Sequence, residues 1–255
     1  MTAIVFSKDR ALQLDAFLRS FETYVWPVLN IEVLYLATSE RHHAAYQEVF
    51  GRHRCAYPRA QGDFRADVLS LVPDSGAVVL FVDDQMFVRP WRVTPMAGLS
   101  LRLAPHLTHC YTNQTEQAQP SWIPFTPELL SWRWSEQAGD WSYPISLDGH
   151  VFEAHELRLM LAQIRFHSPN SLEEALQRFA PEFAARQGYC YHESKVVNVP
   201  WNKVQTDCDN RHEGLASADD LLAQWEAGQQ VDLAPFDGLI NASVHQAMPL
   251  RLEAR

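Results

Sequence analysis

The sequence predicts an α/β protein whose central sheet is covered by helices on both faces. Three short runs, at residues 3–6, 31–37 and 77–82, are apolar apart from Glu32, as in strands that are buried on both sides. Helical patterns separate these runs, which is the order of βαβ units around a parallel sheet. The 255 residues are 47% hydrophobic and 20% charged, a balance typical of globular proteins. We expect a single domain over residues 1–255, with the strands in 1–105 and an elaborated half in 106–255.

Spacing and capping residues predict the elements of the first half. Apolar residues at helical spacing over 14–21 predict the first helix. Ser39 is a suitable N-cap for a helix that extends to residue 50, and Asp63 for a shorter helix that ends near residue 71. The strand at 77–82 (AVVLFV) is the most apolar run of the chain and stops at two aspartates.

The second half is predicted to hold ordered loops followed by helices. Prolines and tryptophans are dense from residue 105 to 144, so we expect loops with an aromatic lining. Amphipathic patterns and caps predict helices at 154–164 and 171–179, a strand at 196–199 and a further helix after Ser217. Ser171 is the expected N-cap of the second helix, and Gly228 would end the last one.

Charge and cysteine content limit the class of protein. Acidic residues outnumber basic residues 31 to 21, for a net charge of −10, which argues against nucleic acid or an anionic membrane surface as a partner. Cys55, Cys110, Cys190 and Cys208 form no C-x-x-C pair, as expected of reduced thiols. We find neither a signal peptide nor an apolar stretch of roughly 20 residues. We expect a cytoplasmic protein without a transmembrane segment, whose oligomeric state is open and includes a homo-oligomer.

Asp83 and Asp84 follow directly on the most apolar strand. Two carboxylates at this position repel each other and lose hydration, so they need a stabilising partner. One such partner is a divalent cation, because Mg²⁺ and Mn²⁺ prefer carboxylate oxygens and share their ligands with substrate phosphates. The alternative is that both are turn residues at a strand–loop junction. In a parallel sheet they would share one edge with the polar residues that follow the first strand.

Ser7, Lys8, Asp9 and Arg10 follow the first strand in the same way. Lys8 and Arg10 are cations that can meet a nucleotide or its phosphates, and Asp9 can accept hydrogen bonds from a base or ribose. Arg65, on the helix before the acidic strand, is a further candidate for a phosphate. The alternatives are an N-cap and first turn for residues 7–10, and a solvated salt-bridge face for Arg65.

Short motifs spread over most of the chain carry a resemblance to a known family. They are F-S-K-D-R and L-Q-L-D after the first strand, F-V-D-D-Q-M-F at the acidic strand, and segments 99–103, 143–150, 168–173, 197–205 and 241–246. Together they resemble the GT-A glycosyltransferases, the family 2-like nucleotide-sugar enzymes in particular. The resemblance implies a Rossmann-type mixed sheet. It also implies a metal-dependent hexosyltransferase that moves a sugar from a nucleotide diphosphate sugar to a hydroxyl acceptor, in surface glycan or polysaccharide synthesis.

The resemblance also implies a set of ligands for the donor. Asp83 and Asp84 stand at the family's D-x-D motif, where this sequence departs from the pattern with Gln85, and with His245 they would hold Mn²⁺ or Mg²⁺. Lys203 would balance the charge of the diphosphate. The nucleotide-sugar site would then comprise Ser7, Lys8, Asp9, Arg10, Arg65, Asp83 and Lys203.

Asp148, in S-L-D-G-H, is our candidate for the base that removes a proton from the acceptor hydroxyl. Gly149 beside it would let the backbone approach a sugar closely. The alternative is an ordinary D-G turn between strands. Trp132, Trp134 and His150 are expected to bind the acceptor, because indole faces pack well on sugar rings. The alternative for the tryptophans is the core.

Two other functions stay open at this point. A non-catalytic module of glycosyltransferase type, which recognises a sugar or a partner protein, is compatible with Gln85 in place of a metal-binding aspartate. A nucleotidyltransferase of similar topology is the nearest rival among enzymes. Such enzymes usually carry a glycine-rich phosphate loop after the first strand, and S-K-D-R-A-L contains no glycine.

Overall fold

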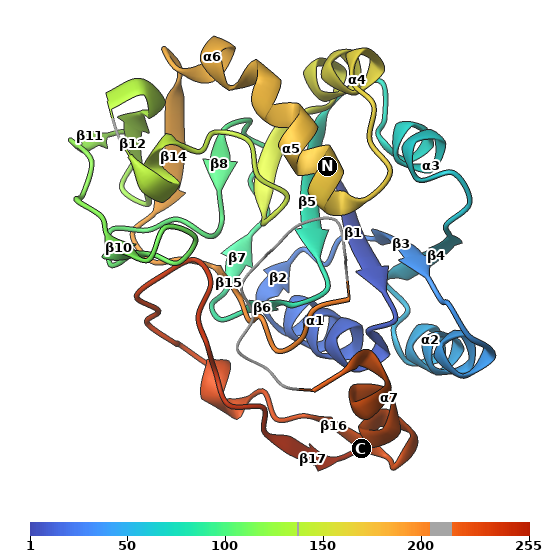
Figure 1. The fold of residues 1–255 in the computed structure, drawn as a ribbon. Helices are drawn as coiled ribbons and strands as arrows, with labels where there is room; N and C mark the ends of the chain where they lie inside the picture. Colours follow the sequence, from blue (N-terminus) through green and yellow to red (C-terminus); the bar gives the residue numbers. More distant parts are fainter. Residues whose placement is uncertain (137, 205–215) are drawn as a thin grey trace.

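The structure is a computed structural model that describes residues 1–136, 138–204 and 216–255; Gln205 and Cys208 lie outside the described residues. Its main sheet contains β1 (Thr2–Lys8), β3 (Ile31–Leu36), β4 (Ala56–Ala60), β5 (Ala77–Val82), β8 (Leu99–Ser100), β11 (Ile123–Pro124), β12 (Leu129–Arg133), β13 (His150–Glu153) and β14 (Gln187–Tyr191). The strand order is β11-β12-β14-β8-β13-β5-β1-β3-β4 (Figure 1).

The sheet is mixed, as predicted. Strands β5, β1, β3 and β4 are parallel, whereas β13 lies antiparallel to both β5 and β8. These four strands come from residues 1–105. Beyond β5 the sheet continues with β13, β8, β14, β12 and β11, four of which come from residues 106–255. The predicted α/β class is confirmed, and the arrangement is consistent with a Rossmann-like glycosyltransferase fold.

Helices cover both faces of the sheet (Figure 1). The helices are α1 (Ala11–Tyr24), α2 (Glu40–Arg52), α3 (Phe64–Leu71), α4 (Ala154–Gln163), α5 (Pro169–Leu176), α6 (Ala180–Phe183) and α7 (Ala218–Glu226), with 3-10 turns at Trp134–Glu136, Gly139–Ser142, Gln177–Phe179 and Ala234–Phe236. Among the described residues, no helix has both the length and the apolar character that crossing a membrane requires.

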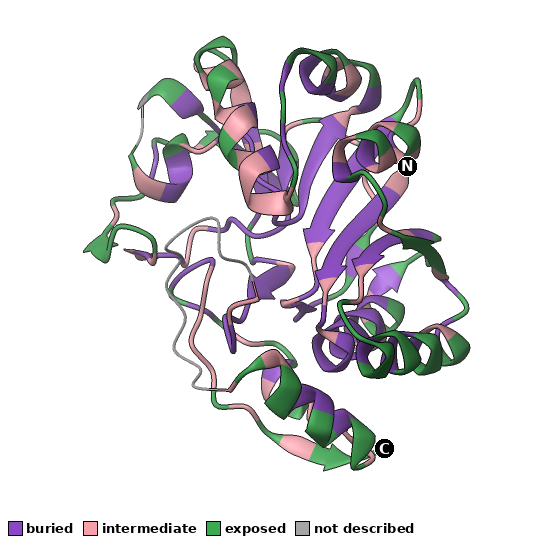
Figure 2. Ribbon diagram, turned by 45° about the vertical axis from the view of Figure 1, so that its right-hand side comes forward, coloured by how far each residue is buried: buried purple, intermediate pink, exposed green. Residues whose placement is uncertain are grey.

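Side chains alternate between the two faces of β1, and this alternation defines two cores. Ala3 and Val5 pack with α1, α2 and α7, whereas Ile4 and Phe6 pack with α3, α4 and α5. Figure 2 shows the central strands buried and the outward faces of the surrounding helices exposed. The all-apolar strand runs of the sequence follow from this arrangement, because both faces of each central strand are covered.

Short strand pairs extend the architecture around the main sheet. They are β2 (Val25–Trp26) with β7 (Trp91–Arg92), β6 (Gln85–Phe87) with β15 (Val196–Asn198), β9 (His109–Cys110) with β10 (Thr115–Glu116), and β16 (Gln229–Val231) with β17 (Leu252–Ala254). Strand β6 begins directly after the two aspartates that end β5. Its pairing with β15 therefore brings a segment of the second half beside that end of β5.

Most caps lie where the sequence predicts them, with one correction. Ser39, Asp63 and Ser217 cap α2, α3 and α7 through their side chains. The helix expected at 171–179 instead begins at Pro169, with Ser168 as its N-cap and Ser171 three residues inside. Ser171 still contributes, because Ser168 and Ser171 form a reciprocal capping box. Proline at the first helical position explains the earlier start, since its fixed φ suits that position.

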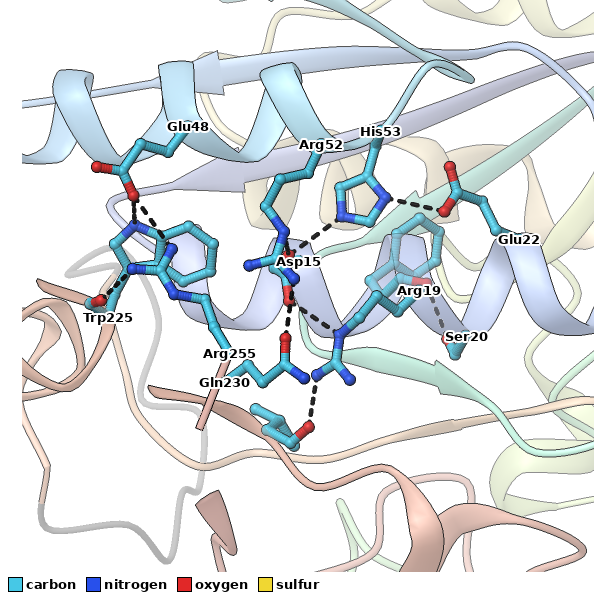
Figure 3. Close-up of polar contacts among 12 residues, drawn as sticks. Asp15, Arg19, Ser20, Glu22, Glu48, Arg52, His53, Trp225, Gln230 and Arg255 are labelled. Atoms are coloured by element: carbon cyan, nitrogen blue, oxygen red, sulfur yellow. Dashed lines mark hydrogen bonds and ion pairs between the residues drawn. The ribbon is translucent and has the colours of Figure 1, made fainter. Parts of the chain in front are cut away.

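A buried polar network joins the C-terminal segment to the sheet-covering helices (Figure 3). Asp15, which is fully buried in α1, accepts from Arg19 at 2.9 Å and from His53 at 3.1 Å. His53 also bonds Glu22 at 3.0 Å. Arg255 bonds Glu48 of α2 at 3.1 Å, which fixes β17 beside α2 and α7.

Candidate active site

A cavity of about 760 Å³ lies beyond the carboxyl ends of β1, β3 and β5. This edge is where open α/β sheets bind ligands. From residues 1–105 its wall includes Ser7, Lys8, Arg10, Asp83, Asp84 and Arg102, and from residues 106–255 Tyr111, Asp140, Tyr143, Asp148, Glu173, Asn198, Lys203 and His245. The structure thus brings together most of the predicted site residues.

Asp83 and Asp84 form the turn that ends β5, and all four of their carboxylate oxygens accept hydrogen bonds. The two oxygens of Asp83 accept from Arg10 Nη1 at 3.0 Å and from Ser7 Oγ at 2.7 Å. The two oxygens of Asp84 accept from the same Arg10 nitrogen at 2.8 Å and from Asn198 Nδ2 at 2.8 Å. One guanidinium therefore bridges the two acids, which relieves their repulsion.

Arg10 is held in this position from several sides. Its backbone N–H, at the start of α1, donates to the Tyr46 hydroxyl at 3.1 Å, and its Nη2 donates to the carbonyl of Asn202. Asn202 is itself fixed, because its side-chain oxygen accepts from Gln13 of α1 at 2.9 Å. The Nε of Arg10 is buried and has no hydrogen-bond partner among the described residues.

The charges of the aspartate pair and Arg10 are strongly coupled. Burial works against the charged form of Arg10, but Asp83 and Asp84 outweigh it and raise the pKa of the guanidinium above its usual value. Burial raises the pKa of Asp83 to about 6, with Arg10 opposing and Asp84 adding to the rise. The pair therefore keeps Arg10 charged at every physiological pH.

Gln85 turns away from this cavity. Its side-chain oxygen accepts from the backbone N–H of Val82 at 3.1 Å, and the cavity wall formed by the described residues does not include it. The residue lies in β6, opposite Asn198 of β15. The third position of the acidic motif thus has a structural role in the turn, and the two aspartates face the cavity as the acidic unit.

Asp148 also lines the cavity, where it pairs with His245. Asp148 Oδ2 lies 3.4 Å from His245 Nε2. Burial raises the pKa of Asp148, but the hydrogen bond and charge of His245 and the charge of Arg102 hold it below its usual value. Burial lowers the pKa of His245, and Asp148 reverses this to a net rise. An ionised carboxylate at the cavity wall is the state that can accept a proton.

Gly149 explains why Asp148 is both a turn residue and a cavity residue. Gly149 has φ +70°, and a Cβ there would lie 3.2 Å from Val196 and 3.3 Å from Leu101. The D-G pair is therefore a tight turn into β13, as the structural alternative held, and the glycine packs against protein. The same turn directs the Asp148 carboxylate to the cavity.

Three further polar residues line the cavity and were not predicted as site residues from the sequence. Asn198 connects the two sides of the cavity, because it bonds Asp84 and also the Asp148 carboxylate. Arg102 Nη1 lies 3.4 Å from Asp140. Glu173 accepts from the N–H of Leu147 at 3.1 Å, and burial followed by the charge of Asp148 raises its pKa. The sequence does carry a signal for Arg102, which stands in the apolar run L-S-L-R-L. An arginine buried in such a run needs polar or acidic partners nearby.

Asp9 and Arg65 stand apart from the other predicted donor residues. Asp9 has φ +52°, and its carboxylate accepts from the N–H and the hydroxyl of Thr38, both at 2.8 Å. Arg65 donates to the carbonyls of Ile164, Leu161 and Ala162, at the C-terminal end of α4. Neither belongs to the cavity wall formed by the described residues. The alternatives are not met either, because within the described ranges α1 has no side-chain N-cap and Arg65 bonds backbone carbonyls rather than an acidic side chain.

Trp132, Trp134 and His150 also lie outside that wall. The two tryptophans are at most 3% exposed and pack edge to face at 4.7 Å within an aromatic core. Gly188 makes room for them, since a Cβ there would lie 2.6 Å from each ring. Burial, with Arg102 adding to it, lowers the pKa of His150 to about 3. The expected aromatic lining of the loops is thus a core, because these rings pack on one another.

The predicted metal ligands do not converge. His245 pairs with Asp148, and the oxygens of Asp83 and Asp84 are already engaged by Arg10, Ser7 and Asn198. Among the described residues, no group of three or more His, Cys, Asp or Glu side chains is placed to hold a metal ion. The residues as placed do not fit a divalent cation, so Mn²⁺ or Mg²⁺ stays a prediction of the sequence.

Comparison with known proteins adds one relative. No family model matches the chain. The chain is similar to a protein of Dictyostelium discoideum named bifunctional glycosyltransferase pgtA, with 24% identity over 266 residues. The similarity covers 86% of this chain and 34% of that protein, so the chain spans about a third of the relative's length.

Proposed function

We propose that this chain is a glycosyltransferase that moves a sugar from a nucleotide diphosphate sugar to a hydroxyl acceptor. The observation that carries the proposal is one cavity at the carboxyl edge of the sheet, lined by two separate charged clusters. Asp83 and Asp84 pair with Arg10 in one cluster, and Asp148 pairs with His245 in the other. The similarity to a protein named as a glycosyltransferase supports the same reaction class.

The donor is proposed to bind at the ends of β1 and β5. Lys8, Arg10 and Lys203 line the cavity there, and cations stabilise a diphosphate as negative charge develops on it. Ser7 positions the site indirectly, because its hydroxyl holds Asp83 and contacts the Tyr46 hydroxyl at 2.6 Å. We leave Asp9 and Arg65 out of the donor site because of their contacts with Thr38 and α4.

Asp148 is proposed as the base. It would take the proton of the acceptor hydroxyl while that oxygen attacks the anomeric carbon of the donor sugar. The bond from this carbon to the diphosphate oxygen breaks, and its electron pair leaves with the nucleotide diphosphate. Paired His245 and neighbouring Arg102 keep Asp148 ionised, so it is ready to accept the proton at neutral pH.

The acceptor is proposed to bind beside Asp148, where aromatic and acidic side chains line the cavity. Tyr111 and Tyr143 can present ring faces to a sugar, in place of the buried Trp132 and Trp134. Glu173, whose pKa is raised by burial and by the charge of Asp148, places a second carboxyl group next to the base. Such a group can hydrogen-bond acceptor hydroxyls as donor or as acceptor.

The proposal is tested by thermal unfolding of the full chain with UDP, GDP and their sugar conjugates. A ligand at 100 times its Kd stabilises the folded state by about 2.7 kcal/mol, a measurable rise in Tm. We expect such a rise with one nucleotide, its loss in Lys8→Met, and no change of binding in the exposed control Arg92→Met. Transfer of labelled sugar to a glycan panel then separates an enzyme from a binding module. Absence of stabilisation by every nucleotide would refute the donor site.

A further inference from the structure

The positive charge between Asp83 and Asp84 comes from the protein itself. Arg10 Nη1 lies 3.0 Å from one carboxylate and 2.8 Å from the other, at the position where a cation shared by both would sit. We propose that Arg10 takes the place of a divalent cation, so that the nucleotide diphosphate binds without metal. This inference rests on the proposed function, since it concerns the same donor site.

Each of the four carboxylate oxygens of the acids already accepts a hydrogen bond from a protein side chain. Besides the two bonds to Arg10, Asp83 accepts from Ser7 at 2.7 Å and Asp84 from Asn198 at 2.8 Å. A divalent cation bound here would have to displace Arg10, whose side chain is only 10% exposed. Removing the partners of a buried charge is strongly unfavourable, because the charge loses its compensation without regaining water.

The other predicted or nearby candidate ligands for a metal, Gln85 and His245, contact other groups of the protein. Gln85, at the third position of the acidic motif, bonds the backbone of Val82. His245 lies 3.4 Å from Asp148. Within the described ranges, no other set of three His, Cys, Asp or Glu side chains is placed to complete a metal site. The sequence expectation of a metal depends on these same residues, and their contacts favour a different source of charge.

The cavity provides for a diphosphate in another way. Lys8 and Lys203 line the same cavity as Arg10 and the two aspartates, so further cations are available to a diphosphate there. A guanidinium has five N–H donors, and Arg10 Nε is buried without a partner among the described residues. A phosphate oxygen is the acceptor that such a donor suits best. Asp83 and Asp84 then serve to hold Arg10 rather than a metal.

The test measures nucleoside diphosphate binding to the full chain by calorimetry, in EDTA and in millimolar Mn²⁺ or Mg²⁺. We expect UDP or GDP to bind in EDTA with a Kd within about twofold of that in Mn²⁺. Tenfold or greater tightening by either metal would overturn the inference and leave the proposed function intact. If no nucleoside diphosphate binds under any condition, the proposed function falls and this inference falls with it.

A variant and a direct metal measurement sharpen the result. Arg10→Met frees the two carboxylates, so we expect binding in EDTA to weaken at least tenfold and Mn²⁺ to restore part of it. Arg65→Met, which removes an arginine outside the cavity wall, is the matched control and should change neither. Electron spin resonance of Mn²⁺ with wild-type protein and nucleotide does not depend on the variant folding. Free Mn²⁺ signal equal to that of nucleotide alone supports the inference, and saturable protein-dependent loss contradicts it.

Discussion

His245 Nε2 lies 3.4 Å from Asp148 Oδ2, although the two residues come from distant segments of the chain. Strand β15 brings the two residues together. The backbone of Asn198 forms a parallel β-bridge with that of His245, and the Asn198 side chain bonds the Asp148 carboxylate. The family resemblance implies a metal ligand at His245, whereas the structure gives it a carboxylate partner. Substitution of either member of this pair therefore tests the acid–base chemistry proposed for the cavity.

Replacing Asp148 with asparagine removes the proposed base and keeps the size of the side chain. We expect kcat to fall by about 10²- to 10⁴-fold, the usual contribution of a positioned base. The Kd for nucleotide should stay the same, because the cations proposed to hold the diphosphate, Lys8, Arg10 and Lys203, are not among the described partners of Asp148. Glu174→Gln, at an exposed position of α5, is the control for loss of one carboxylate. Full transfer activity in Asp148→Asn would show that another group takes the proton.

Replacing His245 with glutamine should shift the pH dependence of the reaction. His245 lowers the pKa of Asp148, so its loss raises that pKa toward the value that burial favours. Asp148 then becomes protonated at higher pH, and the acidic limb of the kcat/KM profile moves upward. The measurement is kcat/KM against pH for wild type and His245→Gln. An acidic limb at the same pH in both proteins would mean that His245 does not act on the base.

Trp132 should contribute to stability and not to acceptor binding. The side chain is fully buried, and its Nε1 donates to the carbonyl of Trp141 at 2.9 Å. Trp132→Ala should lower the free energy of unfolding by about 3–5 kcal/mol, which denaturant titration measures. The milder Trp132→Phe should leave the acceptor KM unchanged, whereas Tyr143→Ala, in the cavity wall, should raise it. A raised KM in Trp132→Phe would restore the tryptophan as an acceptor contact.

His53 should make stability depend on pH. Burial alone lowers its pKa, but the bonds to Asp15 and Glu22 produce a net rise above the ordinary value (Figure 3). A raised folded-state pKa means that the stabilisation is fully present below the unfolded pKa of about 6.5 and is lost as pH rises through the folded value.

His53→Gln should therefore destabilise by about 1–3 kcal/mol near pH 5.5 and by much less near pH 9. Denaturant titrations at the two pH values measure the difference, with the exposed His155→Gln as control. An equal loss at both values would show that packing, and not the charge of His53, stabilises this network.

The sequence predicts β1, β3 and β5 and helices α1 to α3 of the first half, because local signals are strong there, but it misses the exposed edge strand β4. Apolar runs such as β5 report burial directly, and Ser39 and Asp63 mark helix starts through bonds to nearby backbone. Elements in the second half were harder to predict. Strands β12 and β14 pair across a long stretch of chain, and their residues show no alternation long enough to identify them.

Of the candidate site, too, one part can be predicted from the sequence and the other depends on the tertiary structure. The amino-acid sequence places two acids at the end of the most apolar strand and residues 7–10 at the end of the first strand. Parallel pairing of the two strands then brings these residues to one edge of the sheet. Folding in three dimensions decides which charge neutralises which: Arg10 goes to the aspartates, His245 to Asp148 and Arg65 to the end of α4. A residue's type fixes its charge and its need for a partner. The partner itself depends on distances between remote segments, which no local pattern encodes.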